Sequence, residues 1–213
     1  MRSTDWGIGI KKTLHASEQE RPDVKQRREQ WYVAQGAFDI NRLVFLDETG
    51  AKTNMTRLYG RALHGERVVD HAPHGHWCTT TIIGAMRLDG STACMSVDGA
   101  TDKIIFREYV RHILIPTLRP GDIVILDNLS AHKNDEAKTL IEQAGAELLF
   151  LPPYSPDLNP IEKMWSKIKT YLRAAEARTE QTLQEVIGAA LKTVTANDAQ
   201  GWFSSCGYSA CQP

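Results

Sequence analysis

The sequence has no excess of basic residues. Its 25 Lys and Arg are balanced by 26 Asp and Glu, which gives a formal net charge of −1. Proteins that bind duplex nucleic acid usually show a basic excess, so the total charge taken alone argues mildly against that class. The basic residues are nevertheless clustered, at residues 21–28 and 163–173, and a site built from several carboxylates would also lower the total.

The sequence also lacks a long hydrophobic segment. No apolar run approaches the roughly 18 residues that cross a bilayer, and residues 1–12 contain no apolar stretch of the secretory kind. We therefore expect no membrane association and a cytosolic location. Apolar residues still make up 42% of the chain. That is enough for a hydrophobic core and excludes a wholly disordered chain.

Cysteine is scarce, and no two cysteines form a C-x-x-C pair. The spacing therefore favours neither a zinc ribbon nor a thioredoxin motif. In a reducing compartment these residues are expected to be free thiols. The four are Cys78, Cys94, Cys206 and Cys211.

A group of histidines has spacing that could suggest a zinc site, since His71, His74 and His76 lie close together. Imidazoles are poor ligands for Mg²⁺. We favour a surface or sheet role for them, or contact with phosphates from a β-hairpin. Aromatic side chains usually supply buried area rather than stacking platforms for bases. Packing anchors are accordingly predicted at Trp31, Trp77, Trp165 and Trp202.

Apolar runs that alternate with turn residues predict an α/β domain with a mixed sheet. Continuous apolar runs predict buried strands, and an Asp-Gly turn between β-branched segments predicts a hairpin within a β-rich region from residue 59 to 97. A tail is expected after the last helix. The predicted strands outside that region are 43–46, 123–126 and 147–151, and the predicted helices are 22–35, 104–118, 134–144, 160–175 and 182–194.

Three acids stand out in this arrangement. Asp47 and Asp127 each end an apolar strand, and neighbouring parallel strands would bring them together at the carboxyl edge of the sheet. Glu162 follows Asp127 after 34 intervening residues, near the start of a helix. Converging carboxylates repel one another unless divalent cations such as Mg²⁺ or Mn²⁺ neutralise them. Two such ions about 4 Å apart can activate an attacking oxygen and stabilise a leaving oxygen in phosphodiester chemistry.

Each acid also has an ordinary structural interpretation. Asn159 and Glu162 have the spacing of a helix capping box, and the two aspartates could be turn residues. Glu48 competes with Asp47, although adjacent strand residues point to opposite faces. Asp157 competes with Glu162 but is more typical of a turn. The joint pattern, rather than any single residue, therefore carries the prediction.

The helix predicted to begin at residue 160 has two distinct faces. A helical period of 3.6 residues gathers its apolar side chains on one stripe and its polar side chains on the adjacent one. The polar stripe would offer a metal ligand at one end and basic groups for phosphates further along. The apolar set is Ile161, Trp165, Ile168 and Leu172, and the polar set is Glu162, Ser166, Lys169 and Arg173.

At these residues the sequence resembles the DDE domain of insertion-sequence transposases in the Tc/mariner superfamily. The spacing between Asp127 and Glu162 is also the one this group uses, and the resemblance covers about residues 10 to 210. The matching stretches are LDETG at 46–50, PHGHW at 73–77, LDNLSAHK at 126–133 and LPPYSPDLNPIE at 151–162.

The resemblance implies a ribonuclease-H-like fold, a mixed five-stranded sheet flanked by helices. It implies that Asp47, Asp127 and Glu162 are the catalytic residues and the ligands of two Mg²⁺ or Mn²⁺ ions. Water activated at the metals would cut DNA at the element ends, and the freed 3′-hydroxyl would attack target DNA, commonly at a TA step. The implied partners are element ends, target DNA and a second copy of the chain on DNA.

Other residues are assigned to nucleic-acid binding. The resemblance places Asn128 and His132 beside the second acid, where they are expected to position DNA or metal, and Lys133 ends the same matching stretch. The helix pattern and the histidine group supply the rest. The set is His74, His76, Asn128, His132, Lys133, Lys169 and Arg173.

The resemblance also predicts the organisation of the chain. Residues 1–40 are expected to be a linker and helix, 41–180 the catalytic domain, and 181–213 a C-terminal helix and tail. Such transposases usually carry an N-terminal helix-turn-helix region, which this sequence does not show. We expect a truncated copy, or the second frame of a split gene whose DNA-binding region is encoded separately. The alternatives are a hydrolytic nuclease of the same fold or an inactive DNA-binding remnant, and the bacterial cytosol at the nucleoid is the expected location.

Overall fold

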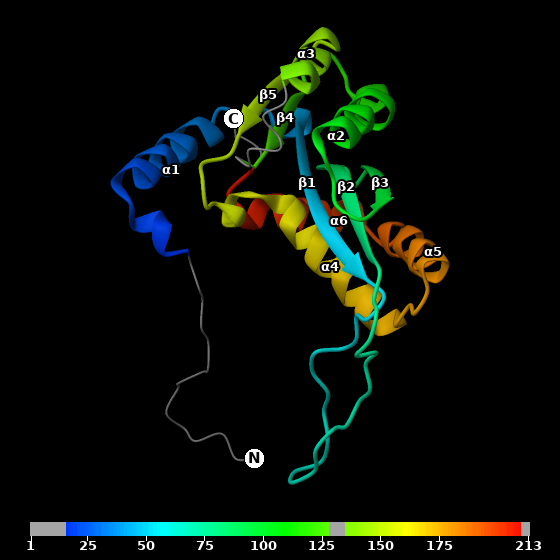
Figure 1. Cartoon of the computed structure of the whole chain (residues 1–213). Coiled ribbons are helices and arrows are strands. Elements are labelled where there is room, and N and C mark those ends of the chain that lie inside the picture. Colours follow the sequence, from blue (N-terminus) through cyan, green and yellow to red (C-terminus); the bar gives the residue numbers. More distant parts are fainter. Residues whose placement is uncertain (1–15, 128–134, 210–213) are drawn as a thin grey trace, which may run out of the picture.

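The computed structural model describes residues 16–127 and 135–209. Within these residues, five strands form one mixed sheet in the order β3-β2-β1-β4-β5 (Figure 1). The central strand β1 is antiparallel to β2 and parallel to β4, and β4 is parallel to β5. This confirms the predicted α/β class with a mixed five-stranded sheet. The strands are β1 (Leu43–Lys52), β2 (Thr79–Arg87), β3 (Thr92–Asp98), β4 (Ile123–Leu126) and β5 (Glu147–Phe150).

Helices cover both faces of the sheet (Figure 1). One core contains side chains of α1, α4, α5 and α6 together with Phe45 and Ile125, and the other contains side chains of α2 and α3 together with Leu46 and Leu126. Successive strand residues thus enter opposite cores, as the pleat of a strand requires. The helices are α1 (Pro22–Gln35), α2 (Lys103–Tyr109), α3 (Asp135–Gln143), α4 (Pro160–Ala175), α5 (Glu180–Leu191) and α6 (Ala196–Ser205).

Strand β1 is longer than the apolar run that predicted it. The sequence indicated a turn after Leu46, but the strand continues to Lys52. The reason is that β1 has a different neighbour on each side. Its parallel pairing with β4 stops at Leu46, while its antiparallel pairing with β2 continues until Lys52 meets Thr79. Asp47 therefore lies within β1, at the point where the parallel neighbour ends.

Two further predictions are wrong. The segment expected to be a tail contains α6, whose N-terminus is closed by a capping box between Thr195 and Asp198 and whose Phe203 is fully buried. The β-rich region begins at residue 79 rather than 59, because residues 59–78 contain no helix or strand. The connection between β1 and β2 extends away from the sheet (Figure 1).

The other boundaries agree closely with the sequence. Helices α1 and α4 have the predicted limits. Asp102 caps α2 by accepting hydrogen bonds from the N–H groups of Ile104 and Ile105, and the helical path continues through a π-helical turn and a 3₁₀ turn to Thr117. No helix in the described part of the chain is long and apolar enough to cross a membrane.

Candidate active site

The register of the sheet places Asp47 beside Asp127. Leu46 of β1 pairs with Leu126 of β4 in the parallel register, and each aspartate is the next residue in its chain. Parallel neighbours lie about 4.8 Å apart, so the two aspartates begin from adjacent backbone positions. Both continue the alternation of the strands onto the face that α4 covers. Asp47 is buried, and its Oδ1 accepts a hydrogen bond of 2.8 Å from the N–H of Glu48.

Glu48 is separated from Asp47 by the same alternation. Because β1 continues as a strand through both residues, their side chains leave opposite faces of the sheet. This agrees with the expectation that Asp47, and not Glu48, faces the site.

Helix α4 carries Glu162 to this edge of the sheet. The helix begins at Pro160, at the first helical position, where the missing N–H of proline costs nothing. Its apolar stripe, which includes Trp165 and Ile168, is buried against the face that contains Phe45. Glu162 lies in the first turn on the polar side of the helix and is exposed. The predicted division of this helix into two faces is confirmed.

A cavity of about 410 Å³ joins the second and third acids. Asp127 and Glu162 both line it, together with Asn159 at the helix N-cap. The rest of the cavity wall comes from the turn-rich segment that precedes α4. The residues of this segment that line the cavity are Leu151, Pro152, Pro153, Tyr154, Ser155 and Pro156.

The acids influence one another electrostatically. Although Glu162 as a whole is exposed, desolvation of its carboxyl group by the surrounding protein raises the pKa of Glu162. The positive charge of Lys169 opposes this shift, and the negative charge of Asp127 adds to it. Ionised Glu162 is therefore at a free-energy disadvantage in the protein alone. A bound cation would remove the disadvantage because it favours the ionised form.

Asn159 does not act as the helix cap that the sequence suggested. Its side chain makes no capping hydrogen bond, although the residue is only 3% exposed. Among the described residues, no group donates a hydrogen bond to its Oδ1. The capping-box interpretation of Asn159 and Glu162 is therefore wrong. A buried amide oxygen in the cavity wall suits a ligand that supplies positive charge or a hydrogen-bond donor.

These donors fit a hard divalent cation. The groups at this edge of the sheet are all oxygen ligands, the kind that Mg²⁺ and Mn²⁺ prefer. Two carboxylates and an amide carbonyl surround the cavity, and a third carboxylate lies on the neighbouring strand. Within residues 16–127 and 135–209, however, no three His, Cys, Asp or Glu side chains are gathered closely enough to form a metal-binding group. The structure thus brings the acids together in pairs. Their joint binding of metal stays a prediction.

The residues assigned to nucleic-acid binding have different positions. Asn128, His132 and Lys133 lie outside the described residues. His74 and His76 are exposed on the extension between β1 and β2. Lys169 and Arg173 line a surface groove of about 320 Å³ that also includes Lys52. The basic end of α4 is therefore continuous with the far end of β1.

The tryptophans follow the prediction with one exception. Trp31 and Trp165 are buried and Trp202 is partly buried against the same core, but Trp77 is 48% exposed. Lys52 places its ammonium group 5.8 Å from the centroid of the Trp77 ring, which is a cation–π contact. Of the four cysteines, Cys78, Cys94 and Cys206 are free thiols as expected. Cys211 lies outside the described residues.

Sequence reasoning missed the contacts that hold the loop before α4. Arg28 of α1 binds Ser155 and Asp157 of this loop, and Tyr154 has a positive φ of 56°. Arg28 belonged to a basic cluster with no feature that separated it from its neighbours. The sequence favours a turn role for Asp157, and its partner lies far away in the sequence.

The mixed sheet has the order β3-β2-β1-β4-β5, with two acids where the pairing of β1 with β4 ends. A third acid lies on α4, the helix that covers this edge. This arrangement defines a ribonuclease-H-like domain. The family model described as DDE superfamily endonuclease matches residues 42–184. The chain therefore belongs to the DDE superfamily endonucleases, as the sequence resemblance predicted.

Solved structures and one curated relative agree with this assignment. The Mos1 strand transfer complex has a TM-score of 0.73 at 15% identity, and the match covers 94% of this chain and 63% of that chain. The catalytic domain of Mos1 mariner transposase has a TM-score of 0.62 at 13% identity, and the match covers 93% of this chain and 92% of that chain. The transposable element Tcb2 transposase of Caenorhabditis briggsae is 26% identical over 85 residues, which span 38% of this chain and 31% of that protein. The match thus spans less than two thirds of the Mos1 chain in the strand transfer complex and less than one third of the Tcb2 transposase.

Proposed function

We propose that this chain is the catalytic domain of a transposase that cleaves DNA and transfers strands with the help of Mg²⁺ or Mn²⁺. One observation carries the proposal. The register that sets Asp47 beside Asp127 also turns both toward α4, where Glu162 shares a cavity with Asp127.

The proteins with similar structures support this proposal. They include a strand transfer complex and paired-end complexes with Mn and with Mg, all of Mos1 transposase. The curated relative from Caenorhabditis briggsae is likewise a transposase. We infer that the partners of this chain are element ends and target DNA, and that two copies act together on DNA.

Each acid has a proposed task. Asp47 and Asp127 would hold a shared divalent ion from neighbouring strands, and Glu162 would close the site from α4. The ions would neutralise the carboxylates, activate the attacking oxygen and stabilise the leaving oxygen. Asn159 would add an amide oxygen or orient a bound water from the cavity wall. Lys169, further along α4, would contact phosphates of the DNA as a point charge.

The organisation of the chain is also a proposal. We assign residues 41–180 to catalysis, residues 1–40 to a linker and helix, and 181–213 to a C-terminal part. The family match at 42–184 supports the central range. Packing of α5 and α6 into the same core as α4 indicates that the C-terminal part stabilises the catalytic part. We place the protein in the bacterial cytosol at the nucleoid because its proposed substrate is DNA.

The test is a cleavage and joining assay with Mn²⁺ and DNA that carries the element ends. Asp127→Asn and Glu162→Gln should each reduce cleavage at least about 100-fold, since even residues that only support a metal ligand commonly cost 10- to 100-fold. The matched control is Glu29→Gln, an exposed acid of α1, which should cut like the wild type. Cleavage that survives Asp127→Asn would refute the assignment. Cleavage without joined product would instead indicate a hydrolytic nuclease.

A further inference from the structure

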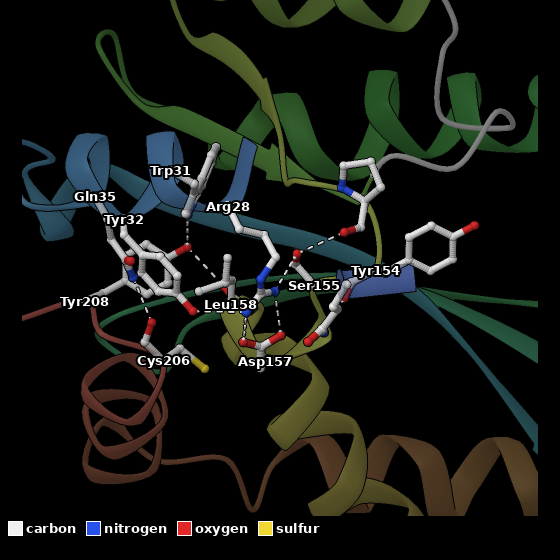
Figure 2. A network of polar contacts seen from close by, with 12 residues as sticks. Arg28, Trp31, Tyr32, Gln35, Tyr154, Ser155, Asp157, Leu158, Cys206 and Tyr208 are labelled. Carbon is white, nitrogen blue, oxygen red and sulfur yellow. Dashed lines mark hydrogen bonds and ion pairs between the residues drawn. The ribbon is translucent and has the colours of Figure 1, made fainter. Parts of the chain in front are cut away.

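Helix α1 and the short turn before it contact the loop at residues 152–159, which walls the cavity (Figure 2). Gln19 donates a hydrogen bond of 2.6 Å from Nε2 to the backbone oxygen of Tyr154. At the other end of the loop, Trp31 donates to the hydroxyl of Tyr208 at 3.0 Å, and that hydroxyl donates to the backbone oxygen of Leu158 at 2.9 Å. Arg28 lies between these two contacts. The loop is thus held along most of its length by α1, by the turn before it and by Tyr208.

Arg28 makes the strongest of these connections. Its Nη1 donates to Ser155 Oγ at 2.7 Å and to Asp157 Oδ1 at 3.0 Å, and its Nη2 donates to Asp157 Oδ2 at 2.7 Å. The Arg28 side chain is 13% exposed and that of Asp157 is 37% exposed. A two-pronged contact of this kind fixes orientation as well as distance, because the guanidinium plane must align with the carboxylate. Tyr32 accepts a further hydrogen bond of 3.0 Å from Nη2 and so steadies the fork.

The loop needs external support of this kind. Tyr154 has φ 56°, in the left-handed region that side chains other than glycine rarely adopt. Tyr154 is 47% exposed, so burial of this residue does not enforce its backbone conformation. A strained backbone conformation persists only where several contacts from the surrounding structure hold it in place. The contacts at Gln19 and Arg28 lie on Tyr154 itself and on the residue that follows it.

The position of the loop determines the position of Glu162. Ser155 lines the cavity beside Asp127. Asp157 lies in the 3₁₀ turn Pro156–Leu158, and α4 begins two residues after that turn. A displaced loop would therefore move one wall of the cavity and the first turn of α4 together.

We propose that Arg28 is a positioning residue of the active site, which holds the loop at 152–159 so that Glu162 faces Asp127 at the distance that a shared cation requires. This inference rests on the proposed function. It also gives α1 a role, since this helix carries Arg28. A force or contact applied to α1 would reach Glu162 through Arg28.

The test compares three variants of the full chain. Arg28→Ala removes the fork, and Arg28→Lys keeps the charge and most of the aliphatic stem but loses the two-pronged contact. Arg21→Ala is the matched control. Arg21 forms an ion pair with Asp23 in which both side chains are more than half exposed, and its guanidinium donates both of its hydrogen bonds to Asp23. Denaturant unfolding of each variant shows whether it is folded.

Three measurements are made on each variant. Hydrogen exchange detected by mass spectrometry follows the backbone of residues 152–162. Calorimetric titration with Mn²⁺ alone gives the metal affinity without DNA. The cleavage assay separates kcat from KM for DNA. A residue that merely stabilised the fold would leave the metal affinity and kcat of the folded protein unchanged.

We expect Arg28→Ala to speed exchange across residues 152–162 and to weaken Mn²⁺ binding about tenfold, the size that supporting residues of metal sites commonly give. The kcat should fall while KM for DNA stays near the wild-type value, and Arg28→Lys should be intermediate. Arg21→Ala should match the wild type throughout. Unchanged loop exchange in folded Arg28→Ala, or faster exchange with wild-type Mn²⁺ affinity, would overturn the inference.

The two proposals can fail separately. A wild-type chain that neither binds Mn²⁺ nor cuts DNA would refute the proposed function. The exchange measurement would then decide alone whether Arg28 holds the loop. Within a functional wild type, a double-mutant cycle between Arg28→Ala and Asp157→Ala gives the coupling directly. Additive effects on Mn²⁺ affinity would refute the positioning role.

Discussion

Gly84 of β2 is the antiparallel partner of Asp47 in β1. The indole ring of Trp165 from α4 occupies the space that a Cβ atom on Gly84 would need. A Cβ added to Gly84 would lie 2.7 Å from Cη2 of Trp165 and 2.7 Å from Sγ of Cys94. The close approach of α4 to the strand that pairs with Asp47 therefore requires glycine. Because Trp165 follows Glu162 by one helical turn, this contact also sets the height of Glu162 above the sheet.

Gly84→Ala should consequently damage both stability and the site. Overpacking of a filled core commonly costs about 1–3 kcal/mol, and here the relief must come from Trp165 and hence from α4. We expect a lower free energy of unfolding together with weaker Mn²⁺ binding, measured by denaturant titration and calorimetry. Gly50→Ala is the control, since no atom of the other described residues, beyond the two chain neighbours of Gly50, lies within 4 Å of a Cβ added there. If both variants bound Mn²⁺ like the wild type, Trp165 would have no influence on the site.

The ion pair of Arg87 with Asp122 should matter for stability and not for the site. Both side chains are less than 9% exposed. Arg87 also donates a hydrogen bond of 2.8 Å to the backbone oxygen of Thr117. Removal of one partner of a buried pair commonly costs about 3–5 kcal/mol. Asp122→Asn should lose an amount of this order in denaturant titrations but keep the wild-type affinity for Mn²⁺. A loss of metal affinity at constant fold would contradict this separation.

Asp122 also makes the stability depend on pH. Burial acts to raise the pKa of Asp122, but hydrogen bonds from Arg87 and from the N–H of Arg119 outweigh it and hold the pKa below its usual value. A depressed folded-state pKa contributes stability that is complete above the unfolded-state pKa and is lost as pH falls through the folded-state value. The stability difference between wild type and Asp122→Asn should therefore shrink below about pH 4. A constant difference down to pH 2 would show that the charge of Asp122 is irrelevant.

Asp198 ties α6 to α4 through a single carboxylate. Its Oδ2 accepts hydrogen bonds of 2.6 Å from Lys167 Nζ and of 2.9 Å from the N–H of Thr195. The hydrogen bonds of Lys167 and Thr195 lower the pKa of Asp198 to about 2. Asp198→Ala should cost about 1.5–3 kcal/mol, the usual range for hydrogen bonds to a charged group, and Asp198→Asn, which keeps a capping oxygen but loses the charge, should cost less. Equal costs in denaturant titrations would mean that the ion pair accounts for the whole effect.

Metal binding should itself stabilise the folded chain. A ligand that binds only the native state adds about 2.7 kcal/mol at 100 times its dissociation constant. Mn²⁺ should therefore raise the thermal unfolding midpoint of the wild type but not that of Asp127→Asn, and EDTA should abolish the difference. An equal rise in both proteins would place the stabilising ion away from Asp127.

Much of this architecture could be predicted from the sequence because the signals are local. The apolar runs at β1 and β4 and the two-faced pattern of α4 depend on residues close together in the chain. The full length of β1 could not be predicted, because its second half is a strand only through pairing with β2. The contact of Arg28 with Asp157 was hidden for the same reason, since 128 residues separate the two in the chain. The pattern of the acids is visible in the sequence. That Asn159 is buried and makes no capping hydrogen bond could not be predicted, because this depends on the geometry of the loop.

The most direct test of the central claim is a crystal structure of the chain with Mn²⁺, from data that locate the ion by its anomalous scattering. The account predicts anomalous density between the carboxylates of Asp47, Asp127 and Glu162, with Mn–O distances near those of hard-cation sites, about 2.0–2.3 Å. Density at another group of residues, or none between Asp47 and Asp127 at saturating Mn²⁺, would contradict it.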